Sequence, residues 1–497
     1  MSRPPLTATD FYRYLQCPHW PYWERFGDVD ERRPWTQLEE QCQADGLEHE
    51  KQIVKKYFGG LQEVRVTSAE NGFKKTLALM QAGAPLIYQG WLVDGDWVGR
   101  PDILERREGK SIFGDWYYAP LDIKRAHEMK KEYMAQLTFY ARLLERIQKR
   151  FPGETAIINA DGERLAFAPD GFLKEFETLH EALERIRDGE IPDPVYRKSC
   201  VDMSPWSLAC FRLASERNDI ALLFNVDVRK LKALRGLGIR TVEEAAELNP
   251  EALEGQAQGL TLRGLLAVKR QARSLRDKRV IIREPFEDPT HGLEIHFDIE
   301  SHPPTDRDYL FGFWLKEKTG ERYQAFIAET PEEEEKMWKG FLAWLPTLPS
   351  EYTVYHYANY EALRLTVLAK RYGDEQNSWL IRFTNNMIDL KEATREHVVL
   401  PLYFYSLKQI CKFLGFSWSG EVQGGRESVV AFEQWLGTKK RSILESILQY
   451  NEDDVKATVF LLDWLRKYAK EEKEYREPYP WIKNPRPGVE GMEKGIS

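Results

Sequence analysis

The stretch LEIHFDIES, residues Leu293 to Ser301, decides the fold of the second half of the chain. Its apolar residues predict a strand, which begins directly after the proline-containing break at Arg283 to Gly292. Residues i and i+2 of a strand point to the same face, so Asp298 and Glu300 are expected side by side. Because two carboxylates inside an apolar run are costly to bury without a cation, the stretch predicts a metal site on this strand.

Further candidate ligands follow this strand at long intervals. The run LQYNEDDVKATVFLL predicts a helix with Tyr450 and Asp454 four residues apart on one face. Between the strand and this helix, VYHYANYEALRL contributes Glu361 and NMIDLKEA contributes Asp389. Two metals about 4 Å apart need several shared carboxylates, and a phenol can orient the attacking water. The order of strands first and helices later favours a central sheet flanked by helices.

This set resembles the DEDD exonucleases of the RNase H-like superfamily, of the DnaQ-like proofreading and YprB types. The resemblance implies an RNase H-like mixed-sheet domain or, as the alternative, a domain that retains this fold but has lost activity. Glu361 stands where the second motif of the family has Asp, and Asp389 is expected to cap or pack. The family landmark YSLKQICKFLGF, Tyr405 to Phe416, is expected to have no chemistry of its own. By the same resemblance, Tyr450 is catalytic and the metal ligands are Asp298, Glu300, Glu361 and Asp454.

The first part of the chain, to about residue 190, alternates strand-like and helix-like runs, a mixed α/β pattern. In PLDIKRA, Asp122 and Lys124 are i and i+2 on a predicted strand, and Asp102 follows VGRP. Gln136 and Tyr140 share one face of a predicted helix. Phosphodiester hydrolysis at neutral pH needs hard oxygen ligands for Mg²⁺ or Mn²⁺ and a positive group near the reacting charge. The two aspartates supply the ligands and the lysine supplies the positive group.

The ordered motifs GLEHE, GRPD, LDIK and QLTFY resemble the PD-(D/E)xK nucleases of the RecB type, which include the CRISPR adaptation nuclease. The family order is His, Gly-x-x-Asp, (Asp/Glu)-x-Lys and Gln-x-x-x-Tyr, and Gly99 opens its second step here. The resemblance implies a restriction-endonuclease-like α/β domain with one metal centre. It implies metal ligands at His49, Asp102 and Asp122, a catalytic Lys124, and DNA-binding residues at Gln136 and Tyr140.

Nucleases of this RecB type often hold an iron–sulfur cluster with one cysteine near the N-terminus and three after the core. Cys17, Cys200 and Cys210 lie at corresponding places and are the candidate ligands of a 4Fe-4S cluster. Four thiolates are the normal requirement, and Met203 occupies the place where a further cysteine is expected. Cys42 is one substitute, and a set of ordinary buried cysteines is the alternative.

A basic segment joins the two motif regions. From Arg229 to Arg279 there are 12 Lys and Arg against 6 Asp and Glu, a local charge of +6. VRKLKALRGLGIRTVEEAAEL predicts two helices joined at Gly236 and Gly238, similar to a helix-hairpin-helix, whose glycine turn lets N–H groups approach a phosphate. The following helix is strongly basic. We expect DNA-backbone contacts here, with a solvated linker as the alternative; the candidate residues are Gly236, Gly238, Lys269, Arg270 and Arg273.

Composition limits the classes of protein to which the chain can belong. Its 497 residues predict about three domains, and 42% hydrophobic with 30% charged residues exclude a disordered or collagen-like chain. The net charge of −8 gives no overall basic field. Five scattered cysteines, no signal-peptide pattern and no apolar run of 18 residues predict a cytoplasmic protein without membrane contact.

The expected organisation is a RecB-like nuclease domain at 1–212, a basic helical connector at 213–285, an RNase H-like domain at 286–472 and a Pro-rich tail at 473–497. The resemblances imply two Mg²⁺- or Mn²⁺-dependent centres that act on single-stranded DNA or DNA ends in repair, recombination or phage defence. No GxxxxGK[ST] phosphate loop is present, so helicase activity would have to come from a partner. The alternatives are an RNA-processing exonuclease and a nucleic-acid-binding scaffold with one or both centres inactive.

Overall fold

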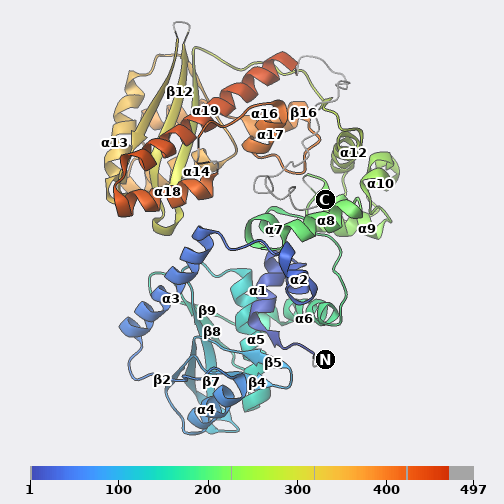
Figure 1. The fold of residues 1–497 in the computed structure, drawn as a ribbon, viewed down its shortest axis with the longest axis vertical. Helices are drawn as coiled ribbons and strands as arrows, with labels where there is room; N and C mark the ends of the chain where they lie inside the picture. Colours follow the sequence, from blue (N-terminus) through green and yellow to red (C-terminus); the bar gives the residue numbers. More distant parts are fainter. Residues whose placement is uncertain (1–2, 225, 318–319, 421, 423, 469–497) are drawn as a thin grey trace. The chain divides into compact units, whose positions relative to one another are not determined.

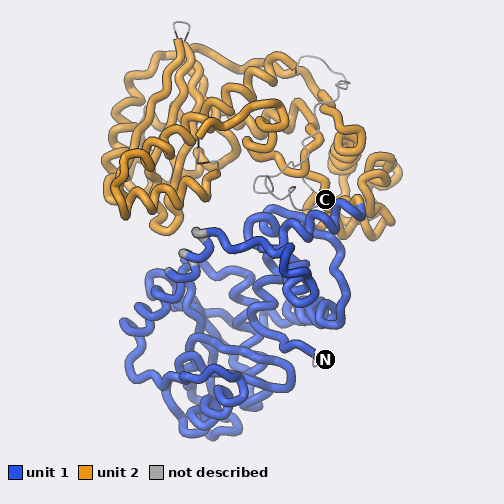
Figure 2. The backbone as a smooth tube through the Cα atoms, in the orientation of Figure 1, with its two compact units in different colours: residues 1–217 blue, residues 218–497 orange. Residues whose placement is uncertain are grey.

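The computed structural model describes residues 3–224, 226–317, 320–420, 422 and 424–468, apart from the side chains at positions 37, 38, 41, 42 and 45. The tail predicted at 473–497 lies outside these residues. The chain divides into two compact units, residues 1–217 and residues 218–497 (Figure 2). Both units mix helices with mixed sheets, as the α/β prediction requires. Among the described helices, none has the length and apolarity that a membrane crossing needs.

A six-stranded mixed sheet forms the centre of the first unit, with the order β2-β3-β6-β7-β8-β9. The antiparallel pair β6·β7 brings Ile103 opposite Leu121, which places Asp102 and Asp122 next to each other. β7 in turn pairs in parallel with β8. The bounds are β2 Gln62–Glu63, β3 Leu86–Tyr88, β6 Ile103–Ser111, β7 Gly114–Ile123, β8 Thr155–Ile158 and β9 Arg164–Phe167.

The helices of the first unit bury aromatic side chains around this sheet. Phe11 stacks on Phe176 with ring centroids 4.8 Å apart, and Trp97 stacks on Phe139 at 4.9 Å. These contacts join helices α1, α5 and α6, which lie together beside α2 (Figure 1). The bounds are α1 Ala8–Gln16, α2 Trp20–Phe26, α3 Gln37–Tyr57, α4 Ala69–Gln81, α5 Lys131–Gln148, α6 Leu173–Arg187, α7 Lys198–Met203 and α8 Ser207–Glu216. A small second sheet has the order β1-β5-β4, with β1 Leu6–Thr7, β5 Trp97–Gly99 and β4 Leu92–Asp94.

The second unit begins with four helices: α9 Val228–Gly236, α10 Val242–Glu247, α11 Pro250–Leu253 and α12 Leu262–Asp277. Gly238 follows α9 with a φ of 82°, a conformation that glycine adopts at little cost. α12 packs against a later part of the same unit, because the buried amide of Gln271 donates to the carbonyl oxygens of Leu400 and Leu402. The predicted helical connector therefore shares a compact unit with the residues that follow it.

A five-stranded sheet with the order β13-β12-β11-β14-β15 lies at the centre of the second unit. β13, β12 and β11 pair antiparallel with one another, and β14 and β15 run parallel to β11. The register of β11 with β12 shifts between Glu300 and Ser301, a bulge at the end of the predicted acidic pair. The bounds are β11 Leu293–His302, β12 Arg307–Glu317, β13 Gly320–Ile327, β14 Tyr352–His356 and β15 Met387–Asp389. A short pair, β10 Ile281–Ile282 and β16 Val398–Val399, lies apart from it.

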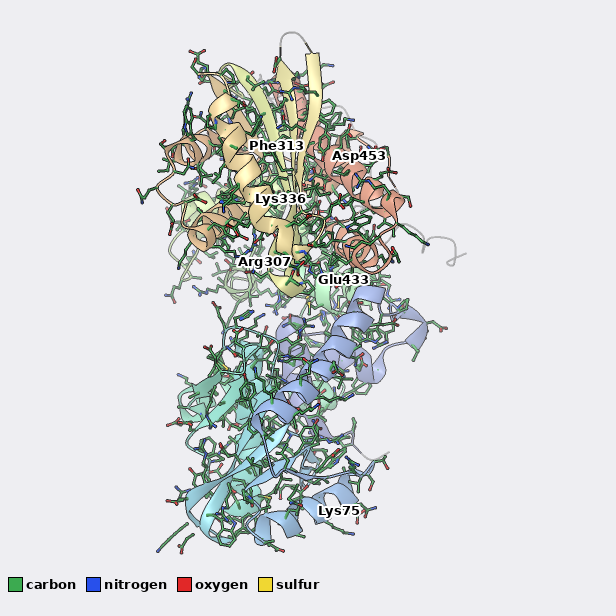
Figure 3. The ribbon with its side chains drawn as sticks, turned by 90° about the vertical axis from the view of Figure 1, so that its left-hand side faces the viewer. Lys75, Arg307, Phe313, Lys336, Glu433 and Asp453 are labelled. Atoms are coloured by element: carbon green, nitrogen blue, oxygen red, sulfur yellow. The ribbon has the colours of Figure 1, made fainter. Side chains whose placement is uncertain are left out.

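Strand β11 alternates between two environments as far as the bulge after Glu300. Its odd-numbered apolar residues, such as Phe297, enter a core with α13, to which Phe313 of β12 also belongs. Its even-numbered polar residues face α19, as Figure 3 illustrates with Phe313 and Asp453 on opposite sides of the sheet. The helices are α13 Glu334–Trp344, α14 Tyr360–Tyr372, α15 Ser378–Asn385, α16 Leu390–His397, α17 Leu407–Leu414, α18 Gly425–Thr438 and α19 Arg441–Tyr468.

Candidate metal centres

Three carboxylates meet between β11 and α19 in the second unit. One carboxylate oxygen from each of Asp298, Glu300 and Asp454 lies within 4.8 Å of the other two. The first two come from the polar face of β11, and the third comes from the middle of α19. Glu300 and Asp454 are buried, and Asp298 is half-buried. This group can hold a divalent cation, because Mg²⁺ and Mn²⁺ prefer clustered carboxylate oxygens.

Burial and mutual repulsion make these carboxylates hard to ionise together. Burial, followed by the charge of Asp454, raises the pKa of Glu300 to about 8. Burial and the charges of Glu300 and Asp454 raise the pKa of Asp298 well above its ordinary value. A bound cation removes this repulsion and favours the ionised forms.

Neutral side chains fix the orientation of the carboxylates. Asn451 Nδ2 donates to Asp298 Oδ2 at 2.7 Å, and Tyr323 donates its hydroxyl to Asn451 Oδ1 at 2.7 Å. Trp418 Nε1 donates to Asp454 Oδ1 at 2.6 Å. Each donor leaves other carboxylate lone pairs for a metal, and such outer partners commonly orient metal ligands.

Tyr450 and Lys408 complete the centre. Tyr450 is buried one helical turn before Asp454 and shares a hydrogen bond with it. Lys408 Nζ lies 4.4 Å from the centroid of the Tyr450 ring, and burial lowers its pKa although Asp454 and Glu300 act in the opposite direction. Lys408 belongs to the stretch Tyr405 to Phe416, and the expectation that this stretch has no chemistry of its own stays a prediction. A lysine in the first turn of α17 opposes the helix dipole, and this local misfit was the available signal.

The remaining predicted acids of this unit lie farther from the group. Glu361, at the start of α14, is buried with Oε2 3.3 Å from His356 Nδ1, and its charge contributes to the raised pKa of Asp298. Its role as a metal ligand stays a prediction. Asp389 caps α16 and accepts hydrogen bonds from the N–H groups of Ala358 and Lys391, both at 2.8 Å. The expected capping role of Asp389 is therefore confirmed.

Gly312 is expected to be intolerant of any side chain. It pairs with Asp298 across β11 and β12, and an added Cβ would lie 1.5 Å from Asn451 Oδ1. We expect Gly312→Ala to push Asn451 off Asp298 and to lower the free energy of unfolding by about 1–3 kcal/mol, measured by urea denaturation.

The control is a double-mutant cycle. An Asn451→Ala background removes the two closest atoms and leaves the Tyr323 hydroxyl at 3.0 Å, so Gly312→Ala should cost clearly less there. Equal costs in the two backgrounds would show that the close approach of Gly312 and Asn451 has no energetic weight.

The first unit contains a second acidic group at the β6·β7 pair. Asp102 Oδ2 accepts from the backbone N–H of Ile123 at 2.7 Å, and Asp122 Oδ1 accepts from the N–H of Asp102 at 3.3 Å. Lys124 Nζ lies 3.0 Å from Asp122 Oδ2. Burial and Asp122 raise the pKa of Asp102 to about 8, and Lys124 partly opposes this. The structure thus brings the predicted Asp, Asp and Lys together.

An acid that sequence reasoning missed approaches the same group. Glu50 of α3 accepts from Gln89 Nε2 at 2.6 Å and from the Tyr88 hydroxyl at 2.8 Å. Gln89 Nε2 also lies 3.2 Å from Asp102 Oδ1, which connects the two acids. Gln89 has a φ of 55°, so its backbone is held in the left-handed region at this point. The motif GLEHE contained Glu50, but the family pattern drew attention to its neighbour His49.

His49, the further predicted metal ligand of this centre, lies on α3. Its ring forms a hydrogen bond with the backbone of Asn159, and its buried Nε2 has no hydrogen-bond partner among the described residues. Burial, followed by Arg125, lowers its pKa and favours the neutral ring that binds metals. Among the described residues, the groups whose ligand atoms lie within 4.8 Å of one another do not include His49 with Asp102 and Asp122.

Gln136 and Tyr140 lie on α5, and both are largely buried. The Tyr140 hydroxyl is 3.5 Å from the carbonyl oxygen of Arg100, at the limit of a hydrogen bond. Burial, followed by the charges of Asp122 and Asp102, raises the pKa of Tyr140. Tyr140 therefore lies within the electrostatic field of the two aspartates, and its DNA contact remains a prediction, as does that of Gln136.

The predicted hairpin turn uses its N–H groups internally. The N–H of Leu237 donates to Ala233 and Leu234, and the N–H of Gly238 donates to the carbonyl oxygen of Arg235 at 3.0 Å. They close the end of α9 and are not directed at a ligand. On α12, Arg273 Nε donates to the carbonyl oxygen of Ala246 at 3.0 Å, so this side chain ties α12 to α10.

Metal binding is expected to stabilise the protein more at high pH. Glu300 and Asp102 have pKa values of about 8 without metal, so the folded chain holds more protons than the unfolded chain between about pH 4 and pH 8. The contribution of these two groups to the free energy of unfolding of the metal-free protein therefore falls as the pH rises through this window. Because Mn²⁺ displaces these protons, its apparent affinity should rise about tenfold per pH unit for each proton displaced.

Thermal unfolding with and without Mn²⁺ at pH 6 and pH 8 measures this effect. The increase in Tm should be larger at pH 8, and Asp298→Asn combined with Asp102→Asn should remove the difference. An equal increase at both pH values in the unmodified chain would contradict the shifted carboxyl groups.

Comparison with known families adds one finding. Residues 295–466 match the family model of the RNase H superfamily. The match extends from β11 into α19, and so includes all five residues predicted for the second centre. It confirms the RNase H-like part of the resemblance and indicates a nuclease-type, metal-dependent hydrolase for this section. No curated protein matches the chain.

Proposed function

We propose that the protein is a divalent-metal-dependent nuclease that hydrolyses DNA at two centres, one in each unit. The observation that carries the proposal is the convergence of Asp298, Glu300 and Asp454 inside the section that matches the RNase H superfamily. Three clustered carboxylates, two of them buried and all with raised pKa values, cost stability unless a cation binds them, so their conjunction favours a functional site over a structural one.

At the second centre each surrounding residue has a distinct task. Asp298, Glu300 and Asp454 would hold Mg²⁺ or Mn²⁺, which when bound would supply a Lewis acid for the phosphodiester and an activated water near neutral pH. Asn451 and Trp418 hold the carboxylates of Asp298 and Asp454 in fixed orientations. Tyr450 positions the attacking water next to Asp454, and the ammonium of Lys408 offsets the negative charge of the substrate phosphate.

At the first centre, Asp102 and Asp122 bind the cation. Glu50 and His49 are adjacent residues on one turn of α3 and are the further candidate ligands. Lys124 is a charged group beside both aspartates. Burial lowers its pKa, but the charges of Asp122 and Asp102 outweigh burial and raise the pKa. Lys124 therefore stays protonated and stabilises the developing negative charge. Gln136 and Tyr140 contact DNA from α5. From the family resemblances we assign internal cleavage of a strand to the first centre and removal of nucleotides from an end to the second.

The basic side chains of α12 are the proposed contacts to the DNA backbone. Lys269 and Arg270 are partly exposed on this helix, whereas Arg273 is engaged by Ala246 and Glu247. A positive local charge of +6 in a chain of −8 favours a polyanion at this place. We propose single-stranded DNA or DNA ends as the substrate, in the cytoplasm, with a helicase or another repair or defence protein as the source of unwound strands.

A time course with Mn²⁺ on labelled linear and closed circular single-stranded DNA tests the proposal. Linear strands should be shortened from an end and circles should be cut, and chelation with EDTA should stop both. Faster degradation of linear RNA of the same sequence would identify the protein as an RNA-processing exonuclease. DNA binding without any cleavage would identify a scaffold and would overturn both catalytic assignments.

A further inference from the structure

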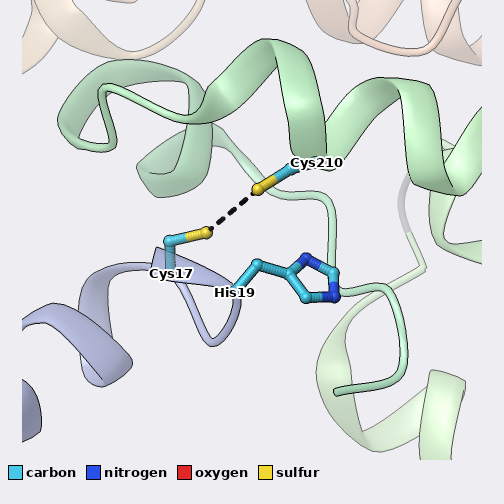
Figure 4. A group of neighbouring side chains, drawn as sticks. All are labelled: Cys17, His19 and Cys210. Atoms are coloured by element: carbon cyan, nitrogen blue, oxygen red, sulfur yellow. Dashed lines mark hydrogen bonds between the residues drawn. The ribbon is translucent and has the colours of Figure 1, made fainter. Parts of the chain in front are cut away.

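Three cysteines and one histidine lie where the residues around the end of α1 meet the last helices of the first unit. Cys17 ends α1 and His19 precedes α2, while Cys200 lies in α7 and Cys210 in α8. All four side chains are at most 1% exposed. Ligand atoms of Cys17, His19 and Cys210 lie within 4.8 Å of one another (Figure 4). Cys200 is outside this group and shares a hydrogen bond with Cys17. Such a buried set has the composition of a metal site.

The geometry does not fit the iron–sulfur cluster implied by the RecB-type resemblance. That cluster takes four thiolates, each on a different iron, so its cysteine sulfurs are spread around the outside of a cube. Here Cys17 Sγ and Cys210 Sγ are only 3.6 Å apart. The described side chains supply three thiols to this place, and Cys42 lies outside the side chains that are described. The distance and the number of thiols both disagree with a four-iron cluster.

The same distance fits two ligands of a single tetrahedral ion. With Zn–S bonds of about 2.3 Å, two sulfur ligands of one zinc lie ~3.8 Å apart. The 3.6 Å between Cys17 and Cys210 is close to this separation. The backbone N–H groups of His19 and Arg197 donate to the sulfurs of Cys17 and Cys200, so both sulfurs are held in place by the chain around them.

The hydrogen bond of His19 leaves Nδ1 as the ring nitrogen that can bind a metal. Its Nε2 lies 2.8 Å from the carbonyl oxygen of Pro192, which can only accept, so Nε2 carries the proton. In the neutral ring, Nδ1 then holds the lone pair, as in the usual pairing of a metal-bound histidine with a backbone carbonyl. Figure 4 shows the imidazole beside the two sulfurs of Cys17 and Cys210.

We propose that Cys17, His19, Cys200 and Cys210 bind one Zn²⁺ in a closed structural site. Four protein ligands leave no open position, so the ion has no part in hydrolysis. It fastens the loop between α1 and α2 to α7 and α8, where Ser199 Oγ already donates to the carbonyl oxygen of Gln16 at 2.8 Å. The inference does not depend on the nuclease activity.

Metal analysis of the full-length protein after extensive desalting is the first test. We expect one zinc per chain in the unmodified protein and its loss in His19→Ala and in Cys200→Ser. Cys411→Ser is the matched control, because Cys411 is a fully buried thiol of the second unit that donates to the carbonyl oxygen of Ala457. This variant should keep its zinc.

Cobalt replacement separates loss of a ligand from loss of the fold. Chain prepared with Co²⁺ should show thiolate-to-cobalt charge-transfer bands and the intense visible bands of a tetrahedral ion, and His19→Cys should retain and shift the visible bands. A protein without zinc that gives no such bands would overturn the proposal. A brown, iron-containing chain or a Cys17–Cys210 disulfide found by mass spectrometry would overturn it equally.

Discussion

Asp298→Asn is expected to abolish end-directed degradation of linear DNA, with a loss of about 10³-fold, or about 4 kcal/mol of transition-state stabilisation. Asp298 forms one acidic group with Glu300 and Asp454, so the change removes one of the three negatively charged carboxylates that would bind the cation. Because the pKa of Asp298 is raised well above its ordinary value, the neutral amide relieves repulsion. The metal-free variant should therefore unfold at the same or a higher temperature, while Mn²⁺ should stabilise it less.

Glu452→Gln is the control for this substitution. Glu452 lies two residues before Asp454 on α19, and its carboxylate binds Lys456 at 2.6 Å on the same helix. Its neutralisation changes the charge of the helix without touching the acidic group, so stepwise degradation should continue. If Asp298→Asn also continues to shorten linear strands, the second centre is inactive and another residue set carries out any observed trimming.

Lys124→Ala is expected to abolish the cutting of closed circles, again by about 10³-fold, since it removes the positive group beside the reacting charge. Its ammonium is 3.0 Å from Asp122 Oδ2 and also favours the ionised form of Asp102. The measurement is the rate of circle opening with Mn²⁺ in an Asp298→Asn background, in which end trimming is absent. Lys124→Arg should restore part of the rate, because it keeps the charge but changes its geometry.

The control for the first centre is Lys131→Ala. Lys131 is about half exposed on α5 and forms an ion pair with Glu175 away from the aspartates, so circle opening should be unchanged. Unchanged opening by Lys124→Ala as well would place the endonuclease elsewhere and would leave Asp102 and Asp122 without a catalytic partner. Because end trimming and circle opening are separate readings, failure of one centre does not imply failure of the other.

Local rules were sufficient to predict the acidic strand. The alternation that places Asp298 and Glu300 on one face depends only on the period of a strand, and the RNase H superfamily match confirms the section around it. Asp454 was accessible through its helical spacing from Tyr450 and the family pattern. The order of strands first and helices later also predicted a central sheet flanked by helices, and the second unit has a five-stranded sheet at its centre.

Contacts between distant segments were beyond such rules. Asn451 meets Asp298 across 153 residues, and the sequence around Gly312 gives no sign that Asn451 needs its space. Glu50 reaches Asp102 only through Gln89, and Lys408 reaches the second centre only because α17 packs against α19. His19 likewise had no signal in the sequence, because the resemblance implies cysteine ligands alone.

The contact between Cys17 and Cys210 can form only after a long part of the chain has been synthesised. These residues are 193 positions apart in the chain. A ribosome that adds about 5–20 residues per second needs roughly 10–40 s between them. During that time the loop after α1 has emerged without α7 and α8, which complete its surroundings. The segment around Cys17 is therefore made before α7 and α8 but reaches its final structure only after them.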